Sequence, residues 1–360
     1  MGSVGTTTIV LIGLLLFGSS LAQDASTLAQ DESLVFFRST ASLDRLGETW
    51  RLPIHGWVYE PQRSQVRKAL VAQALQTGFG LKVDEKTAAN FESRVNLLLA
   101  DNERGKQVVV RIGDRVHSMA PTGPNGQFEG MIQLPADEAE ALAQDGIINY
   151  QAVLETDDLR SFSGQVRLVP YTGISVISDI DDTIKVTSVT DHGKLLDYTF
   201  LRDFEPVPDM APVYKNWSMG PTAFHLVSSS PWQLYLPLQE FLDDAGFPWA
   251  SFHLKIVRFR DETLLDLLKP GTESKPEQIK AILKRYPGRR FVLIGDSGEQ
   301  DPEVYASIFR QHSEQILSIF IRNVTAASRE DARFTDTFKN VPASRWRLFS
   351  EPSSLELPDN

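Results

Sequence analysis

One short stretch of the chain carries three carboxylates and a hydroxyl, supplied by Asp179, Asp181, Asp182 and Thr183. Like charges this close raise one another's pKa, so a bound cation, a neighbouring lysine or a proton must compensate them. A helix-loop-helix calcium site is excluded, because its sixth and twelfth positions require Gly and Glu. Counted from Asp179, those positions hold Ile184 and Thr190. A solvated acidic turn remains the alternative to a site.

The residues before this cluster predict a buried strand. Ile174, Val176 and Ile177 form an apolar, β-branched run, which is typical of a parallel strand covered on both faces. In open α/β sheets, ligands bind outside the carboxyl ends of the strands. The carboxylates therefore lie where chemistry is expected.

A second strand, expected over residues 223–227, runs into a group of serines. Pro231 suits the first position of a helix and Ser230 suits its N-cap, which gives Ser230 a structural explanation. Ser228 has no such explanation. Its hydroxyl and the adjoining backbone N–H could hold a phosphate oxygen.

A lysine opens a later helix. Residues 274–277 form a capping box, so Lys275 lies in the first turn. The helix macrodipole disfavours a cation there by about 0.3–1 kcal/mol. A lysine at this position indicates a nearby anion, with a solvent-exposed lysine as the alternative.

Further carboxylates follow the strand expected at residues 291–295. Asp296 comes directly off this strand, beside Gly295 and Gly298, which allow a tight backbone. Together with the first cluster it makes an oxygen-rich site fit for Mg²⁺. Asp301 precedes Pro302 and is interpreted either as part of that site or as a helix N-cap.

The elements that must position these residues fall into two groups. After Pro170, apolar strands alternate with helices, which predicts an α/β fold with a parallel sheet; these strands are Ile174–Ser178, Ala223–Ser228, Phe252–Val257, Phe291–Gly295 and Ile316–Ile321. Before it, a helix is expected at residues 62–76 among short strands. Such strands suggest a β-rich, sandwich-like domain; they are Trp50–Tyr59, Ser93–Ala100, Gln107–Ile112, Gln127–Leu134, Ile147–Leu154 and Gly164–Val169.

The chain of 360 residues, 42% of them hydrophobic, is long enough for two domains. The predicted division is a signal peptide at 1–22, a flexible lead-in at 23–46, the β-rich domain at 47–170, the α/β domain at 171–350 and a disordered tail at 351–360. The net charge of −11, without a Lys/Arg run, argues against a nucleic-acid partner and against bulk attraction to an anionic membrane.

The first residues resemble an export signal. An apolar run over residues 7–17, followed by small residues at Ser20 and Ala22, predicts cleavage after Ala22. An uncleaved membrane anchor is the alternative, because basic residues are missing before the run. The absence of cysteine excludes disulfides and acylation on cysteine. The expected location is periplasmic or secreted, with membrane association left open.

Taken together, these motifs resemble a known family. Asp179-x-Asp181-x-Thr183, Ser228, Lys275 and Gly295-Asp296-x4-Asp301 resemble, in order, the four motifs of haloacid dehalogenase-superfamily phosphatases. The stretches 178–185, 227–232 and 295–299 are most similar to the catalytic domain of the lipin-related actin-patch phosphatidate phosphatases. The resemblance covers about residues 170–325. It implies a Rossmann-like parallel sheet with a minimal cap.

The resemblance also implies roles for individual residues. Asp179 is the expected nucleophile, which forms an aspartyl-phosphate, and Asp181 is the expected general acid and base. Thr183 and Ser228 are expected to bind phosphoryl oxygens, and Lys275 to offset their charge. Mg²⁺ is expected to bind the side chains of Asp179, Asp296 and Asp301. It is also expected to bind the backbone carbonyl of Asp181. Asp182 is left without a role, as a surface acid.

The substrate implied by the resemblance is phosphatidate, hydrolysed to diacylglycerol at a membrane surface. Short insertions after the first two strands predict an open site, with residues 192–217 as a small lid, although the aromatic residues of that segment suit a core. Arg258, Arg260 and Lys269 form the nearest basic group. A phosphatase for soluble or polymer phosphomonoesters and a non-catalytic phospholipid-binding module are the two alternatives.

Overall fold

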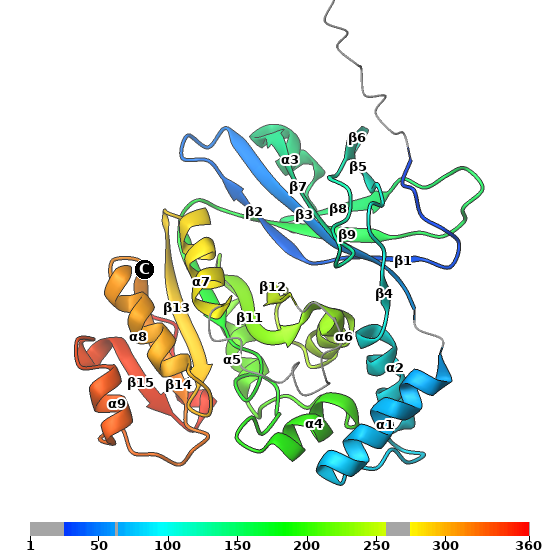
Figure 1. The fold of residues 1–360 in the computed structure, drawn as a ribbon. Helices are drawn as coiled ribbons and strands as arrows, with labels where there is room; N and C mark the ends of the chain where they lie inside the picture. The colour runs from blue at the N-terminus through cyan, green and yellow to red at the C-terminus, as the bar shows by residue number, and fades with distance from the viewer. Residues whose placement is uncertain (1–24, 62–63, 257–273, 360) are drawn as a thin grey trace, which may run out of the picture.

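The computed structural model describes residues 25–61, 64–256 and 274–359. The predicted signal peptide and the predicted basic group of Arg258, Arg260 and Lys269 lie outside these residues. The described part contains two β-sheets (Figure 1), one of nine strands, sheet A, and one of six, sheet B. None of its helices has the length and apolar character needed to cross a bilayer.

Sheet B holds the predicted parallel strands. It consists of β10 (Gly173–Ser178), β11 (Ala223–Pro231), β12 (Ala250–Lys255), β13 (Arg289–Asp296), β14 (Ile316–Arg322) and β15 (Trp346–Phe349). The strand order is β12-β11-β10-β13-β14-β15, and every pairing is parallel. The chain starts at β10 in the middle and builds outward in both directions, so the order reverses between β10 and β13. A sheet of this kind binds ligands at that reversal point. The sequence did not predict β15.

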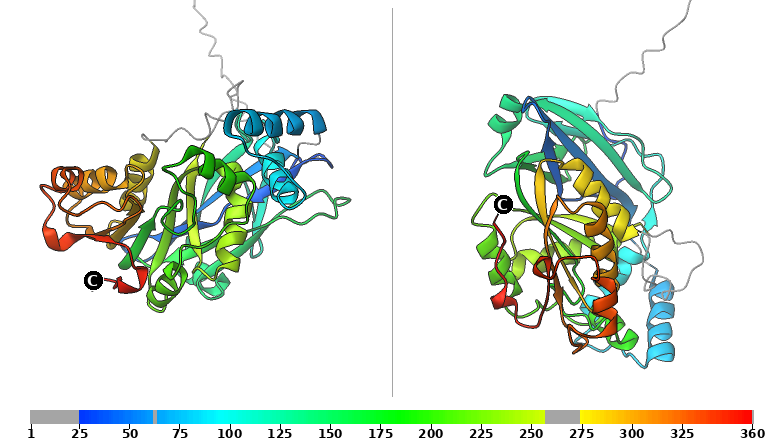
Figure 2. Two further views of the ribbon diagram at one scale, coloured as in Figure 1. Left: turned by 90° about the horizontal axis from the view of Figure 1, so that it is seen from below. Right: turned by 90° about the vertical axis from the view of Figure 1, so that its left-hand side faces the viewer.

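Helices cover both faces of sheet B. Val176 and Ile177 are neighbours in β10 and pack into different clusters, as the alternation of a strand requires. The first cluster includes α4 (His192–Phe200), α5 (Met210–Trp217) and α6 (Tyr235–Asp244); the second includes α7 (Ser274–Arg285), α8 (Asp301–Gln311) and α9 (Ala332–Thr337). Figure 2 shows the yellow and orange helices of the second cluster on one side of the sheet.

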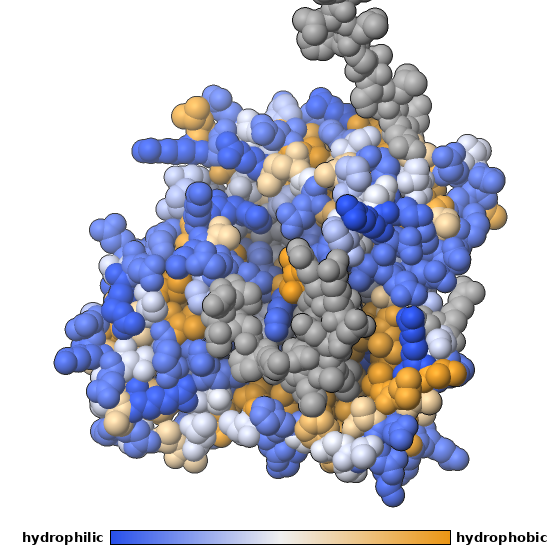
Figure 3. Space-filling model, viewed as in Figure 1, coloured by the Kyte–Doolittle hydropathy of each residue, from blue (hydrophilic) through white to orange (hydrophobic). Residues whose placement is uncertain are grey.

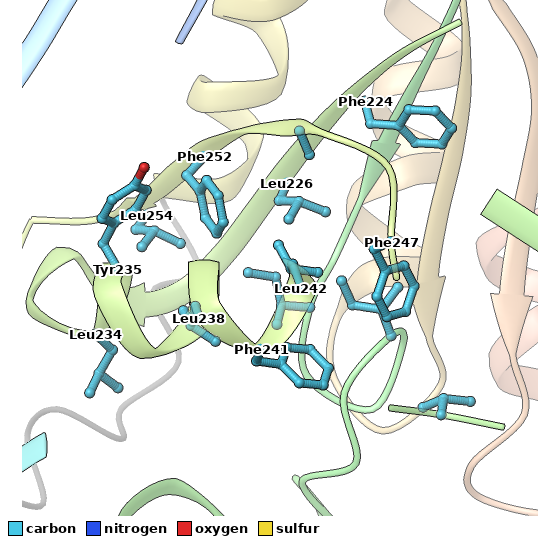
Figure 4. Close-up of a cluster of buried hydrophobic side chains, with 14 of the residues drawn as sticks. Phe224, Leu226, Leu234, Tyr235, Leu238, Phe241, Leu242, Phe247, Phe252 and Leu254 are labelled. Carbon is cyan, nitrogen blue, oxygen red and sulfur yellow. The ribbon is translucent and has the colours of Figure 1, made fainter. Parts of the chain in front are cut away.

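The packing of α6 illustrates how apolar residues fix these layers. In Figure 4, Leu238 and Leu242 lie beside Leu226 and Phe252 of sheet B. All four side chains are at most 3% exposed. Burying a side chain of this size stabilises the fold by about 1.5–3 kcal/mol.

Sheet A consists of β1 (Ser33–Phe36), β2 (Ser39–Leu43), β3 (Thr49–Glu60), β4 (Asp101–Asn102), β5 (Val109–Ile112), β6 (Arg115–Ser118), β7 (Gln127–Pro135), β8 (Ile147–Ala152) and β9 (Ser163–Val169). The prediction that this half is rich in β-strands agrees with sheet A. The prediction of a sandwich does not agree with it. A sandwich has two separate sheets, whereas all nine strands are hydrogen-bonded into one. Leu52, Val110, Phe128 and Ile148 come from four of these strands and share one apolar cluster, which also takes up Ala139 of α3 (Ala136–Leu142).

Several local expectations were wrong. The predicted flexible lead-in contains β1 and β2, because Phe36 and Ala41 are buried in the core of sheet A. Most of the predicted strand at residues 93–100 belongs to helix α2 (Ala88–Leu98), whose buried Phe91, Val95 and Leu98 recur at helical spacing. Helix α1 (Gln65–Phe79) lies where a helix was expected. The predicted disordered tail contains a short 3-10 turn at 352–354 and a buried Leu355.

Helix α2 attaches the N-terminal half to sheet B. Arg94 is 5% exposed, and its Nη1 donates to the carbonyl oxygens of Thr199 (3.0 Å) and Arg202 (2.7 Å) at the end of α4. Its guanidinium also lies 3.8 Å from the centre of the Phe204 ring. A cation stabilises the negative end of a helix dipole. The end of α4 is therefore held by a residue from the other half of the chain.

Candidate active site

Three buried carboxylates meet at the reversal point of sheet B. Asp179 follows β10, Asp296 ends β13 and Asp301 begins α8. Their side chains are at most 1% exposed, and one carboxylate oxygen from each lies within 4.8 Å of the others. The structure thus brings together the acids that the sequence placed at two separate strand ends. Oxygen ligands at this separation suit a hard divalent cation.

A glycine allows Asp301 to reach the strand. Its Oδ2 accepts a hydrogen bond from the backbone N–H of Asp296 (3.2 Å), and a Cβ on Gly295 would lie only 2.1 Å from that oxygen. The N-cap position of α8 is Gln300 rather than Asp301. The N-cap interpretation of Asp301 was therefore wrong, and its carboxylate belongs to the acidic cluster.

The carboxylate of Asp296 is only half satisfied. Its Oδ1 accepts from the backbone N–H groups of Gly298 (2.5 Å) and Glu299 (3.2 Å). Its Oδ2 is buried and finds no hydrogen-bond partner in the part of the chain that the structure describes. Buried polar atoms are nearly always paired, so an orphaned carboxylate oxygen indicates a missing cation or donor.

A single buried lysine balances part of this charge. The Nζ of Lys275 lies 2.9 Å from Asp179 Oδ1, 2.5 Å from Asp301 Oδ1 and 3.6 Å from Glu299 Oε2. Lys275 is 5% exposed, so the predicted nearby anion is present and the exposed-lysine alternative was wrong.

Burial raises the pKa of Asp179. The charge of Lys275 lowers this pKa, and the charge of Asp301 raises it further. Burial also raises the pKa of Asp296, together with the charges of Asp301 and Glu299. Four carboxyl groups around one ammonium need further positive charge, which bound protons or a divalent ion can supply.

Asp181 lies beside this cluster in a different environment. Its Oδ1 accepts from Lys185 Nζ (2.8 Å) and Thr187 Oγ1 (2.8 Å), and its Oδ2 accepts from Ser228 Oγ (3.3 Å) and Ser230 Oγ (3.1 Å). Burial alone raises the pKa of Asp181, but Lys185 and these hydroxyl donors lower it below its usual value. Asp181 is therefore held in its ionised form. Its side chain does not belong to the cluster of three buried carboxylates.

Two donors to Asp181 were missed in the sequence. Ser230 was expected to cap a helix, but it lies in β11 and donates to Asp181. Residues two apart on a strand share a face, so the spacing of Ser228 and Ser230 could have revealed this. Lys185 is 2% exposed and lies four residues after Asp181, a spacing that the sequence alone did not connect to the site.

Thr183 and Asp182 complete the loop after β10. Thr183 Oγ1 donates to Asp179 Oδ2 at 3.3 Å, so it touches the acid predicted to react. The expectation that Asp182 is a surface acid was wrong, because it is 6% exposed. Its carboxylate accepts the backbone N–H groups of Thr187, Ser188 and Val189 at 2.6–2.9 Å. It therefore fixes the loop that carries Thr187 to Asp181.

An apolar groove adjoins Asp181 and Ser230. It encloses about 60 Å³ and also borders Glu299. Its apolar walls come from α2, α4, the end of β11 and the segments after β10 and β11; they are Leu98, Val189, Leu195, Phe200, Pro231 and Leu234. The predicted lid at 192–217 contains α4 and α5, and only α4 reaches the groove. Phe200 and Trp217 are buried in the core, as the sequence favoured.

Fold and site together define an α/β protein with an acidic crevice at the reversal point of a parallel sheet. Residues 174–323 match the family described as phosphatidate phosphatase APP1, catalytic domain. Phosphatidate phosphatase APP1 of Saccharomyces cerevisiae is 38% identical over 157 residues, which are 42% of this chain and 26% of that protein. An uncharacterized protein of Schizosaccharomyces pombe is 33% identical over 180 residues, which are 48% of this chain and 29% of that protein.

These matches confirm the resemblance for the segment that holds the site, which includes every residue from Asp179 to Asp301. The chain spans less than a third of the length of either relative. Among solved structures, a haloacid dehalogenase family hydrolase from Salmonella enterica is 10% identical, with a TM-score of 0.24, over 70% of this chain and 85% of that one. A β-glucuronidase of Parabacteroides merdae is 11% identical, with a TM-score of 0.28, over 81% and 34%. Scores this low carry no argument about the fold.

Proposed function

We propose that this chain is a Mg²⁺-dependent phosphatidate phosphatase of the haloacid dehalogenase type, which releases diacylglycerol and inorganic phosphate. The observation that carries the proposal is that the segment matching the APP1 catalytic domain contains the whole cluster of acids around Lys275. The yeast relative supports phosphatidate as the substrate.

The buried carboxylates fit a magnesium ion. Asp179, Asp296 and Asp301 would hold it, with the backbone carbonyl of Asp181 as a further ligand. The orphaned Asp296 Oδ2 and the excess of carboxylates over ammonium groups support this assignment. When bound, the ion supplies positive charge that offsets the charge of the phosphoryl group.

The reaction is divided between two aspartates. A carboxylate oxygen of Asp179 attacks phosphorus, the bond from phosphorus to the ester oxygen breaks, and the leaving oxygen of diacylglycerol takes a proton from Asp181. Water then attacks the aspartyl-phosphate, Asp181 accepts its proton, and phosphate leaves Asp179. The proton that Asp181 gains serves the next leaving group. Its donors Lys185 and Thr187 favour the ionised form that the second step needs.

Polar side chains position the transferring group. Thr183 donates a hydrogen bond to Asp179, and Ser228 donates one to Asp181, so each hydroxyl lies next to one of the two acids. Either can turn to a phosphoryl oxygen. Lys275 offsets charge on Asp179 and on the phosphate. Fixed donors and charges of this kind supply most of the catalysis in phosphoryl transfer.

Apolar surface near the site supports a lipid substrate. The groove beside Asp181 offers apolar contact to the first part of an acyl chain. Helix α1, which packs on α2, exposes Val66 (71%) and Leu70 (60%) one turn apart. Figure 3 shows hydrophobic atoms gathered over the part of this face where α1 and α2 lie. Exposed apolar side chains that lie close together suit contact with a lipid surface.

Metal dependence is the first test. Mg²⁺ should restore phosphatidate turnover after EDTA treatment and raise the free energy of unfolding, by about 2.7 kcal/mol at a hundredfold excess over Kd. Asp296→Asn should lose most of this stabilisation. It keeps the oxygen that accepts from Gly298 and Glu299, so it should still fold. Mixed-micelle assays and thermal unfolding measure both effects. If the chain with Mg²⁺ hydrolysed neither phosphatidate nor an aryl phosphate, the proposal would be wrong. The non-catalytic lipid-binding alternative would then be favoured.

Substitution in the groove tests the lipid substrate. Leu195→Asn should lower kcat/KM for long-chain phosphatidate about tenfold, because a polar group replaces an apolar wall worth about 1.5–3 kcal/mol. Turnover of an aryl phosphate should not change. Lys194→Asn is the control, since that side chain is 65% exposed on the same helix. Equal losses of kcat/KM on both substrates would show that the groove does not bind the acyl chain. Better turnover of soluble phosphoesters than of phosphatidate by the unmodified chain would favour the soluble-substrate alternative.

A further inference from the structure

Helix α9 reaches back to the loop that follows Asp296. Arg333, in the first turn of α9, donates from Nη1 to the carbonyl oxygen of Ser297 (2.5 Å) and from Nη2 to that of Glu299 (2.5 Å). Both carbonyl groups belong to the short loop between β13 and α8. Arg333 lies outside residues 174–323, which match the APP1 catalytic domain. A side chain from beyond the matching segment therefore holds this loop at two points.

The guanidinium of Arg333 is itself oriented by an ion pair. Glu303, in the first turn of α8, accepts from its Nε at 2.7 Å and from its Nη2 at 3.0 Å. A planar guanidinium that binds a carboxylate at two points has a fixed direction. The two side chains are 37% and 42% exposed, so the pair adds little stability by itself. Its effect is to aim the other N–H groups of Arg333 at the loop.

The peptide that Arg333 holds is also the peptide that binds Asp296. The carbonyl of Ser297 and the N–H of Gly298 belong to one planar trans peptide unit, in which the two groups point in opposite directions. The carbonyl accepts from Arg333, and the N–H donates to Asp296 Oδ1 at 2.5 Å. Hydrogen bonds in such a chain polarise and strengthen one another. Arg333 therefore fixes a donor that orients the Asp296 carboxylate.

This loop binds one oxygen of Asp296 and leaves the other. The N–H of Glu299 also donates to Oδ1, at 3.2 Å. A Cβ on Gly298 would lie 2.9 Å from Oδ1, so the backbone passes directly against this oxygen. Oδ2 is buried and has no hydrogen-bond partner among the described residues. Because the loop holds Oδ1, it sets the direction in which Oδ2 points.

We propose that Arg333 is a positioning residue for the divalent ion. By holding the peptide between Ser297 and Gly298, it keeps the Asp296 carboxylate in the orientation that binds Mg²⁺. The inference rests on the proposed function, because it takes the acids around Lys275 as the Mg²⁺ site. Groups that hold metal ligands in place typically contribute about 10–100-fold to metal affinity. Arg333 acts through one further peptide, so we expect an effect at the lower end of this range.

Direct titration with Mg²⁺ tests this role without relying on turnover. In isothermal titration calorimetry of the full chain, Arg333→Gln should raise the Kd for Mg²⁺ about tenfold. Arg333→Lys should raise it about threefold, because an ammonium group lacks the planar fork that reaches both carbonyls. Arg310→Gln is the control. Arg310 donates to the carbonyl of Thr337 at 3.0 Å, so it connects α8 to the end of α9, and its removal should leave the Kd unchanged.

The stabilisation by Mg²⁺ separates positioning from a purely structural role. In EDTA, Arg333→Gln should melt close to the temperature of the unmodified chain, but it should gain less from a fixed concentration of Mg²⁺. The Mg²⁺ concentration that gives half of the maximal aryl phosphatase rate should rise about tenfold, while the rate at saturating Mg²⁺ should approach that of the unmodified chain. An equal loss of melting temperature with and without Mg²⁺, at an unchanged Kd, would assign Arg333 to the packing of α9 and overturn the inference.

The outcomes also distinguish this inference from the proposed function. If Arg333→Gln weakens Mg²⁺ binding but the unmodified chain hydrolyses no phosphomonoester, the phosphatase proposal is wrong and the role of Arg333 stands. If the unmodified chain hydrolyses phosphatidate and Arg333→Gln binds Mg²⁺ equally well, the inference is wrong and the phosphatase proposal stands. An unmodified chain that binds no Mg²⁺ would overturn the inference.

Discussion

Asp179→Asn is expected to reduce phosphatidate turnover by at least about a thousandfold and to leave the fold intact. Asparagine keeps the shape of the side chain, but its amide cannot form the aspartyl-phosphate. Steady-state turnover with Mg²⁺ in mixed micelles measures the loss. Asp244→Asn, which changes an exposed carboxylate at the end of α6, should retain full activity. A rate in Asp179→Asn equal to that of the unmodified chain would refute the nucleophile role.

The same variant has a predictable stability. Burial raises the pKa of Asp179, so the folded chain without metal pays for its ionised form. Stability from this group is fully present below the unfolded pKa of about 3.9 and falls as the pH rises through the raised folded value. The Asp179→Asn variant does not lose this stability at neutral pH, because asparagine does not ionise. In EDTA it should therefore unfold at the same or a higher urea concentration than the unmodified chain at neutral pH.

The meeting of the acids could be predicted because parallel strands impose it. Asp179 directly follows β10 and Asp296 ends β13, and neighbouring parallel strands end at the same edge of the sheet. The anion beside Lys275 could also be predicted, because a cation in the first turn of a helix is unfavourable without an anion nearby. The structure shows that anion in Asp179 and Asp301.

Other parts of the site depend on contacts that local patterns do not encode. Ser230 matched an N-cap pattern as well as a strand pattern, and only the extension of β11 decides between them. Asp182 adopts a positive φ of 52°, which turns its carboxylate onto three backbone N–H groups. Leu98 reaches the groove because Arg94 attaches α2 to the end of α4, more than one hundred residues later in the chain.

Lys275→Met should be the most destabilising of the substitutions considered. Removing one partner of a buried ion pair typically costs about 3–5 kcal/mol, because the other charge stays buried and unpaired. Here Asp179 and Asp301, both 1% exposed, lose their nearest cation. Urea unfolding in EDTA at neutral pH measures the cost. Turnover should fall as well, because the charge of Asp179 and the phosphate is no longer offset.

Mg²⁺ and pH should change this cost in defined directions. A bound divalent ion replaces part of the missing positive charge, so Mg²⁺ should stabilise Lys275→Met more than it stabilises the unmodified chain. The cost should shrink as the pH falls, because the carboxylates can then take up protons. Lys280→Met is the matched control: its exposed ion pair with Glu277 is worth at most about 1 kcal/mol. Equal stability of the two lysine variants would mean that Lys275 does not hold the acidic cluster together.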